Sequence, residues 1–585
     1  MIQTPFAVTA EPLTAPTQGP FLQAVSMGPL PPGLSLTRDW TIGQMFDATV
    51  AAHEHQDAVV YADRNYRLTW GQFKTEVDRL AQGLMALGVQ KGEKVAIWAT
   101  NVPHWVTLQF ATAQIGAVLL TINTNCKSTE IDYLLRQSDT ENIFIIDGVR
   151  DTDFVATFYD LVPELKTQPR GELHSPRYPF LKRVFFLGPE KHRGIYAMPE
   201  VQAMACTVGE AEYRERQGQL SCHDVVNMQY TSGTTGFPKG VQLTHHNILN
   251  NGYWIGANQN LSGADRVCIP VPLFHCFGCV LGVMACVNHG ATMVILEKFD
   301  AVNVMMSIER ERCTALYGVP TMFIAILEHP LFARFDFGTL RTGIMAGSPC
   351  PAKTMSECMD HMHMKEVTIC YGLTESSPVM TQTRFDEPDI NRKCTTVGRA
   401  LPGVEVAVIS PETGQILATG EPGELCCRGY LTMAGYYKLP ADTASCIDGN
   451  GWLHSGDIGI MDPEGYYKVT GRLKDMIIRG GENIYPKEVE EYLHSMEGVS
   501  DIQVVGVPSR THGEEVAAFV VLKAGATLVE ADIQDFCRGK IGRHKIPRFV
   551  AFVSSFPMTA SGKIQKYKLR EQAVELWPGA AKVEA

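Results

Sequence analysis

The chain has 585 residues, of which 45% are apolar and 19% charged, and its formal net charge is −12. This composition excludes a disordered chain, and the negative charge excludes the broad basic surface with which proteins bind nucleic acids or anionic membranes. At roughly 100–200 residues per domain, the length predicts several structural units.

The first segment, Met1 to Leu36, is rich in Pro, Thr and Ala and carries one charged residue, Glu11. It lacks the basic start and apolar run of a secretory signal and the arginines of a transit peptide. We expect a loosely ordered extension over residues 1–39. No apolar run reaches the ~18 residues of a spanning helix, the C-terminal Val583-Glu584-Ala585 is no peroxisomal signal, and the sixteen scattered cysteines are typical of reduced core thiols. We therefore expect a cytoplasmic protein.

From Trp40 onward, short β-branched runs alternate with longer stretches of helical period. Strands are predicted at Lys94 to Trp98 and Ala291 to Leu296, and a helix at Gly71 to Leu87. This alternation predicts an α/β fold with a large N-terminal domain of several subdomains. The stretch from Arg150 to Ala205 is richer in Pro, Tyr and charged residues, and we expect it to form a peripheral segment that contributes little to the core.

The stretch Tyr230 to Val241, YTSGTTGFPKGV, combines three glycines, several hydroxyls and one lysine. Glycines allow backbone N–H groups to turn toward one point, and the hydroxyls and lysine add donors and positive charge, so the stretch suits a polyphosphate. It is not a Walker A loop, because Lys239 follows Pro238 and precedes Gly240. A polar surface loop is the alternative that composition alone leaves open.

Polar residues also follow a predicted strand at Val367 to Cys370, in the sequence Tyr371-Gly-Leu-Thr-Glu375. Ligand sites of α/β proteins gather where strands end. A carboxylate there suits magnesium, a hard ion that binds substrate phosphates. Taken by itself, the motif also fits an ordinary exit from a strand with a surface glutamate.

The sequence pattern changes again near Gly465, where a region with its own predicted elements begins. A helix is predicted from Pro486, with Val489, Leu493 and Met496 on one face. Two strands follow, Ile502 to Val507 and Val516 to Leu522, and then a basic tail. These features predict a separate, small α+β domain at the C-terminus.

Together these motifs resemble the signature of the adenylate-forming superfamily, which includes acyl-CoA synthetases, adenylation domains of nonribosomal peptide synthetases and firefly luciferase. The resemblance runs from about Trp40 to Arg570 and implies an AMP-binding domain over residues 40–473. It also implies a mobile C-terminal domain over residues 474–585 that carries the catalytic lysine, Lys563, in Ala560-Ser-Gly-Lys-Ile564.

The resemblance implies a role for each matching residue. ATP phosphates would meet Lys239 and the loop residues Thr231, Ser232, Gly233, Thr234, Thr235 and Gly236. Adenine would meet Tyr371 and the turn formed by Gly347, Ser348 and Pro349. Thr374 would contact the α-phosphate and Glu375 would hold Mg²⁺. Asp457 would accept hydrogen bonds from both ribose hydroxyls, and Arg472 would also contact the nucleotide. Lys474 would be the hinge, and Gly480 and Gly481 would approach coenzyme A.

The implied activity is that of an acid–thiol ligase, which joins a fatty acid to coenzyme A through an acyl-adenylate and releases AMP and pyrophosphate. The whole pattern is most similar to fatty acyl-CoA synthetases of the medium-chain type. His275 matches a position at the mouth of their acyl pocket, although a core histidine flanked by aromatic residues is an equal alternative.

Two other functions remain open. An aryl or other carboxylic acid is one alternative substrate, including its loading onto a carrier protein. A nucleotide-binding regulator is the non-enzymatic alternative, although binding alone requires neither the Mg²⁺ carboxylate nor the mobile lysine. No zinc site is expected at the following residues, because they lack ligand spacing and second partners: His245, His246, His361, His363, Cys426 and Cys427.

Overall fold

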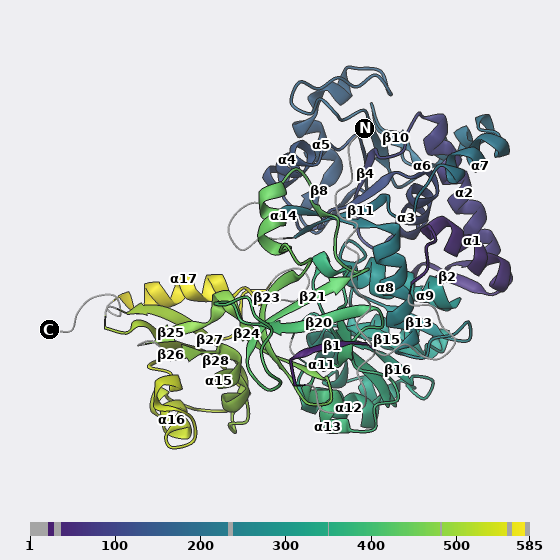
Figure 1. The fold of residues 1–585 in the computed structure, drawn as a ribbon. Helices are drawn as coiled ribbons and strands as arrows, with labels where there is room; N and C mark the ends of the chain where they lie inside the picture. Colours follow the sequence, from purple (N-terminus) through teal and green to yellow (C-terminus); the bar gives the residue numbers. More distant parts are fainter. Residues whose placement is uncertain are drawn as a thin grey trace.

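The computed structural model describes residues 22–28, 37–231, 238–348, 350–479, 482–509, 511–558 and 564–578. Two large sheets, a smaller antiparallel sheet and a C-terminal sheet contain nearly all the described strands (Figure 1). The alternation of β-branched runs with helical segments predicted this α/β architecture, and the prediction is confirmed.

The first large sheet has eight strands, and those from β10 to β11 in its spatial order run parallel. Antiparallel strands β12 and β22 complete one edge. The predicted strand at Lys94 to Trp98 is β4, near the middle of the sheet. In spatial order the strands are β10 (Tyr196–Ala197), β9 (Arg183–Phe186), β6 (Asn142–Ile145), β4 (Lys94–Trp98), β5 (Val118–Thr121), β11 (Val225–Thr231), β12 (Lys239–Thr244) and β22 (Gly435–Tyr436).

The second large sheet has nine strands, with a parallel centre and antiparallel strands at both edges. The prediction at Ala291 to Leu296 corresponds to β14, and that at Val367 to Cys370 to β17. The spatial order is β19 (Arg399–Ala400), β18 (Thr381–Gln382), β17 (Glu366–Tyr371), β16 (Thr342–Met345), β15 (Ala315–Gly318), β13 (Arg266–Ile269), β14 (Thr292–Ile295), β2 (Asp57–Tyr61) and β3 (Tyr66–Thr69).

Helices cover the two sheets in three layers, because the sheets bury apolar side chains on both faces. The largest apolar cluster lies between the sheets and includes α1 (Ile42–His53), α2 (Trp70–Ala86), α3 (Pro103–Ile115), α8 (His245–Ala257), the π-helix η4 (Phe277–Met284) and α9 (Ala285–His289). The outer face of the eight-stranded sheet packs against α4 (Ser128–Gln137) and α5 (Phe154–Leu161). The outer face of the nine-stranded sheet packs against α10 (Ala301–Glu311), α11 (Pro320–Leu327) and α12 (Ala352–His361).

The predicted helix at Gly71 to Leu87 is α2, and its sequence explains where it begins. Thr69 accepts a hydrogen bond from the backbone of Gln72, and the Gln72 side chain accepts one from the backbone of Thr69. This reciprocal cap satisfies amides that the first turn leaves unpaired. The apolar positions of α2 then face the layer between the sheets.

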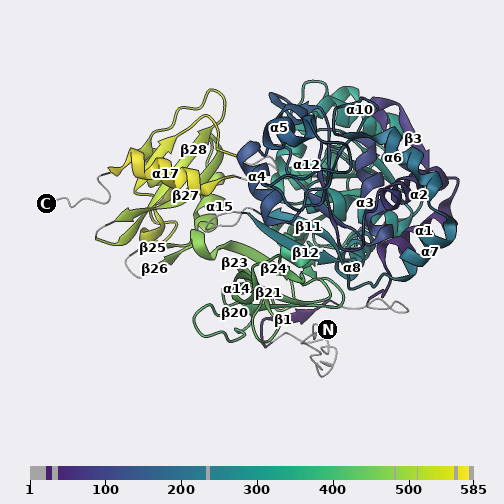
Figure 2. The same cartoon turned by 90° about the horizontal axis from the view of Figure 1, so that it is seen from above.

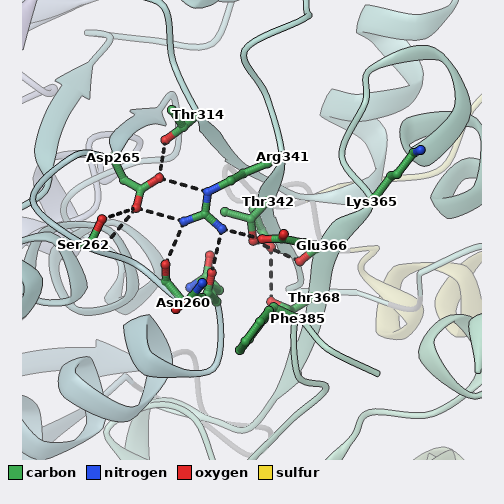
Figure 3. Close-up of polar contacts among 12 residues, drawn as sticks. Asn260, Ser262, Asp265, Thr314, Arg341, Thr342, Lys365, Glu366, Thr368 and Phe385 are labelled. Carbon is green, nitrogen blue, oxygen red and sulfur yellow. Dashed lines mark hydrogen bonds and ion pairs between the residues drawn. The ribbon is translucent and has the colours of Figure 1, made fainter. Parts of the chain in front are cut away.

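A polar network joins the amino ends of strands in the nine-stranded sheet (Figure 3). Arg341, directly before β16, donates from Nη2 to Asp265 Oδ2 at 2.9 Å and also pairs with Glu366, the first residue of β17. Asp265 precedes β13 and accepts from Thr314 at 2.7 Å. Asp265 is 3% exposed, so its charge is balanced almost entirely by these partners.

The five-stranded antiparallel sheet corrects one expectation. Residues 22–28 of the N-terminal extension are not loosely ordered, because β1 pairs with β20 and Ser26 Oγ lies 2.8 Å from the hydroxyl of Tyr467. A short edge strand without an amphipathic pattern leaves little signal in the sequence. The strands are β1 (Val25–Met27), β20 (Val404–Ile409), β21 (Gly423–Gly429), β23 (Leu453–Met461) and β24 (Tyr467–Arg472).

The expectation of little core between Arg150 and Ala205 is wrong. This stretch supplies β9 and β10 to the eight-stranded sheet, and Phe185 and Phe186 are buried on its two faces. It also contains α5 and α6 (Met198–Met204), of which Val201 is fully buried against α2. Prolines and charged residues also occur inside the elements, such as Arg183 in β9 and Pro199 and Glu200 in α6, so the four-residue strand has little signal in the sequence.

The C-terminal elements, yellow and yellow-green in Figures 1 and 2, form a body beside the rest of the chain. The predicted helix from Pro486 is confirmed, although it ends at His494, before Met496. The sheet contains β26 (Glu482–Ile484), β25 (Ile477–Arg479), β28 (Gly513–Leu522), β27 (Val499–Ser509) and β29 (Phe549–Phe552). The helices are α15 (Pro486–His494), α16 (Glu530–Cys537) and α17 (Lys566–Leu576).

Two further observations concern the whole described chain. Its helices include none with the length and apolar character required to cross a membrane. All sixteen cysteines are free thiols, and Cys426 and Cys427 face different apolar clusters on the two sides of β21, as their adjacency in a strand predicts.

Candidate active site

The predicted phosphate loop connects two paired strands of the eight-stranded sheet. Thr231 is the last residue of β11 and Lys239 is the first of β12, and the two are partners in the antiparallel register. The backbone therefore brings both ends of the loop together. The predicted loop residues Ser232, Gly233, Thr234, Thr235 and Gly236 lie outside the described residues.

Glu375 follows the end of β17 and lies in a single helical turn, η6 (Thr374–Ser376). The approach to this turn requires a glycine, because a Cβ added to Gly372 would lie 2.0 Å from the carbonyl oxygen of Pro378. Glu375 is 9% exposed, and its Oε1 lies 3.5 Å from Oγ1 of Thr231. This contact links the end of the nine-stranded sheet to the eight-stranded sheet.

Asp457, in β23 of the five-stranded antiparallel sheet, lies in the same region. Its Oδ2 accepts a hydrogen bond from the hydroxyl of Tyr371 at 2.8 Å, and its Oδ1 accepts one from Nε of Arg472 at 2.7 Å. Burial and then the nearby Asp457 charge raise the pKa of Tyr371 well above its usual value. The Asp457 charge also raises the pKa of Arg472. The predicted adenine and ribose residues are thus in direct contact.

The structure adds two residues that the sequence did not single out, both close to Lys239. The ammonium group of Lys239 forms an ion pair with Asp442 of α14 (Pro440–Cys446) and lies 5.1 Å from the centroid of the Tyr436 ring. The hydroxyl of Tyr436 donates to Glu375 Oε1 at 2.8 Å. In the sequence, Tyr436 and Asp442 belong only to a tyrosine pair followed by an acidic residue, and this is not a distinctive motif.

Other predicted residues lie at strand ends nearby. Gly347 and Ser348 follow β16, and Gly347 has a φ of 90°, which favours glycine. His275 precedes the π-helix η4, and its Nδ1 accepts from the backbone N–H of Phe277 at 3.1 Å. Next to it, Cys276 Sγ lies 3.8 Å from Oγ1 of Thr374. The region expected to hold the acyl group therefore adjoins the predicted α-phosphate contact.

The remaining predicted residues, apart from Pro349, belong to the C-terminal part. Lys474 lies in the turn η7 (Leu473–Asp475), between β24 of the five-stranded sheet and β25 of the C-terminal sheet. Burial, and next the charge of Arg472, lower the pKa of Lys474. Pro349, Gly480, Gly481 and the predicted catalytic Lys563 lie outside the described residues.

A second polar group supports the loop that carries Asp457. His454 Nδ1 donates to Glu424 Oε2 at 2.7 Å, and the other oxygen of Glu424 accepts from the backbone N–H of Gly456 at 2.8 Å. Cys426 Sγ lies 3.4 Å from the same nitrogen of His454, so Glu424, Cys426 and His454 have ligand atoms close to one another. The hydrogen bond that His454 donates to Glu424 raises the pKa of His454, as expected for an ion pair that fixes the turn before Asp457.

The site therefore lies where three sheets meet, and it combines a lysine, a carboxylate with neighbouring hydroxyls and a second carboxylate held by two donors. Lysine is a phosphate-binding cation, and a carboxylate suits the vicinal hydroxyls of ribose. Oxygen ligands are those that Mg²⁺ prefers. The arrangement can bind a nucleoside triphosphate and act on its phosphates.

Comparison with known families gives two matches. The model of the AMP-binding enzyme family matches residues 46–437, and that of the AMP-binding enzyme C-terminal domain matches residues 488–563. The first match covers more than half of the chain.

Curated relatives and solved structures agree with these matches. The chain is 52% identical over 537 residues to YngI of Bacillus subtilis (strain 168), provisionally named an acyl-CoA synthetase, covering 92% of this chain and 98% of the relative. It is 41% identical to the mitochondrial medium-chain acyl-CoA ligase ACSF2 of Rattus norvegicus, covering 91% and 87%. The ATP-bound crystal structure of MatB from Rhodopseudomonas palustris superposes with a TM-score of 0.80 at 28% identity, covering 92% and 99%.

Proposed function

The chain belongs to the AMP-binding enzyme family and is an AMP-forming acyl-CoA synthetase, and on this premise we propose that it activates medium-chain fatty acids in the cytoplasm. The medium chain length is supported by the name of the ACSF2 relatives. The cytoplasm is supported by sixteen free cysteines. One observation carries the proposed site, namely that residues from three sheets converge on it. Tyr436 contacts both Lys239 and Glu375, and Asp457 contacts Tyr371 at the end of β17, the strand that leads to Glu375.

In the proposed first step, the carboxylate of the fatty acid attacks the α-phosphorus of ATP and pyrophosphate leaves. Lys239 binds the outer phosphates, Thr374 contacts the α-phosphate and Asp457 binds the ribose hydroxyls. Lys563 then contacts both the new acyl oxygen and the phosphate. Catalysis of such a step consists mainly of positioning and charge stabilisation. In the second step the thiolate of coenzyme A attacks the acyl carbonyl, and AMP leaves with the electron pair of the broken C–O bond.

The residues around Glu375 fit a magnesium ion. Thr231 and Tyr436 both contact Oε1, whereas Oε2 has no hydrogen-bond partner within the described part of the chain. A carboxylate oxygen and a nearby hydroxyl are hard oxygen donors of the kind that Mg²⁺ prefers. When bound, the ion would neutralise charge on the departing pyrophosphate.

An acid panel tests the proposed function. Pyrophosphate release is measured with fatty acids of increasing length, benzoate and anthranilate, with coenzyme A present or absent. We expect the largest kcat/KM for a medium-chain acid and turnover that requires coenzyme A. Best turnover of an aryl acid would instead support the aryl-acid alternative. A solved anthranilate CoA ligase is structurally similar to this chain, with a TM-score of 0.80 at 26% identity.

Two variants, Lys563→Ala and Lys474→Pro, test the proposed roles of the C-terminal domain in the two half-reactions. Lys563→Ala should slow acyl-adenylate formation by roughly 10²–10³, the typical effect of losing one preorganised contact to a developing charge. It should still convert supplied acyl-adenylate to the thioester. Lys474→Pro, which fixes φ in the proposed hinge, should spare adenylation and block transfer. Equal loss of both half-reactions in Lys563→Ala would refute the assignment of Lys563.

A further inference from the structure

One short segment, Met433 to Asp442, contacts both ends of the phosphate site. Its strand β22 pairs with β12 in antiparallel register, with Tyr436 opposite Val241. Its backbone also reaches the other sheet, because the N–H of Met433 donates to the carbonyl oxygen of Glu375 at 3.0 Å. The segment therefore joins the strand that begins with the phosphate lysine to the turn that carries the metal carboxylate.

Within this segment the side chain of Tyr436 contacts both functional groups. Its hydroxyl donates to Oε1 of Glu375 at 2.8 Å, and its ring lies beside the ammonium group of Lys239, at 5.1 Å from the centroid. A cation at this distance from an aromatic ring is attracted by the electron density of the ring face. One rigid side chain thus bridges two residues that are distant in sequence.

The carboxylate of Glu375 depends on few donors for its orientation. Among the described residues, only the hydroxyl of Tyr436, at 2.8 Å, and Oγ1 of Thr231, at 3.5 Å, donate to its side chain. Glu375 is 9% exposed, and a nearly buried carboxylate requires such donors to hold one orientation.

We propose that Tyr436 is a positioning residue of the phosphate site, where its hydroxyl fixes one oxygen of Glu375 and leaves the other oxygen for the metal ion. This inference rests on the proposed role of Glu375 as the metal ligand. Loss of the hydroxyl should let the carboxylate rotate. The metal would then bind more weakly, while the acid site would be unaffected.

The test compares Tyr436→Phe with Tyr437→Phe. Phenylalanine keeps the ring beside Lys239 and removes only the donor. The control removes the hydroxyl of the adjacent tyrosine, which donates to Asp139 Oδ2 at 2.9 Å, away from Glu375. Binding of Mn²⁺, a paramagnetic substitute for Mg²⁺, is titrated by electron paramagnetic resonance in the presence of a non-hydrolysable ATP analogue.

Hydrogen bonds to charged groups contribute enough that we expect Mn²⁺ to bind about tenfold more weakly to Tyr436→Phe. Tyr437→Phe should change its affinity by less than about twofold, and the KM for the fatty acid should not change in either variant. Thermal denaturation is measured in parallel, and Tyr436→His, which retains an N–H donor, should recover part of the lost affinity.

A double-mutant cycle separates positioning from a general structural effect. If Tyr436 acts through Glu375, then Tyr436→Phe should weaken Mn²⁺ binding no further in a Glu375→Gln background. Wild-type affinity in Tyr436→Phe, or an undiminished effect in the Glu375→Gln background, would overturn the inference. Failure of the proposed function would look different, since the wild-type protein would then bind neither the ATP analogue nor Mn²⁺ with it.

Discussion

Replacement of Asp442 by asparagine should tighten ATP binding. In the structure the carboxylate of Asp442 pairs with the ammonium group of Lys239, the group that we propose binds the outer phosphates. ATP must either displace this carboxylate or bind next to its negative charge. Asparagine keeps the shape of the side chain and removes the charge.

The exposure of the pair sets the size of the effect. The side chains of Lys239 and Asp442 are 23% and 36% exposed, so solvent screens their attraction. Ion pairs of this kind contribute about 0.2–1 kcal/mol. If the whole contribution opposes ATP binding, its loss lowers the dissociation constant by up to about fivefold.

The assay is calorimetric titration of MgATP at 50 and 500 mM salt. We expect tighter binding by Asp442→Asn at low salt and a smaller difference at high salt, because screening shortens to a few Å. The control is Glu210→Gln on α7 (Glu210–Gly218), which removes one negative charge from an exposed pair with Arg214 and should leave affinity unchanged. Weaker binding by Asp442→Asn would refute competition and show that Asp442 orients Lys239.

Two further predictions concern stability. Arg341→Met should lower the free energy of unfolding by about 3 kcal/mol, because it leaves the nearly buried Asp265 without its guanidinium partner. Urea denaturation measures this loss of stability. The double variant Arg341→Met with Asp265→Leu should recover part of it. His245 is fully buried, which lowers its pKa to about 4. Since the unfolded value is about 6.5, stability is lost as pH falls from 6.5 toward 4. About 2 kcal/mol should be lost between pH 7 and 5, and His245→Asn should lose correspondingly less over that range.

Regular elements with strong periodicity were predictable from the sequence. In β4, residues Val95 to Trp98 form a continuous apolar run that is buried on both faces, and α2 has an apolar stripe and a reciprocal cap. In both, the local pattern agrees with the tertiary environment, so propensity and burial favour the same structure. The failures were β1 and β9, which are short strands whose partners lie far away in the chain, Val25–Met27 with β20 and Arg183–Phe186 with β6.

The candidate site shows the same division. The sequence singled out Thr231 and Glu375 through motifs with chemical character and Asp457 through the family resemblance, but it could not indicate that three different sheets bring them together. Those contacts depend on which strand ends adjoin, such as the approach of Glu375 to Thr231 at 3.5 Å. Spacing along the chain does not determine such an approach.

Tyr436 and Asp442 were not predictable from the sequence for a related reason. Neither belongs to a glycine-rich or metal-ligand pattern, and β22 is only two residues long. Their importance arises from one antiparallel pairing, which places Tyr436 opposite Val241 and so beside the strand that Lys239 begins. A motif supplies the reacting groups, whereas the residues that hold them in place are selected by the fold. A search for positioning residues in this site should therefore begin with the strand neighbours of each motif.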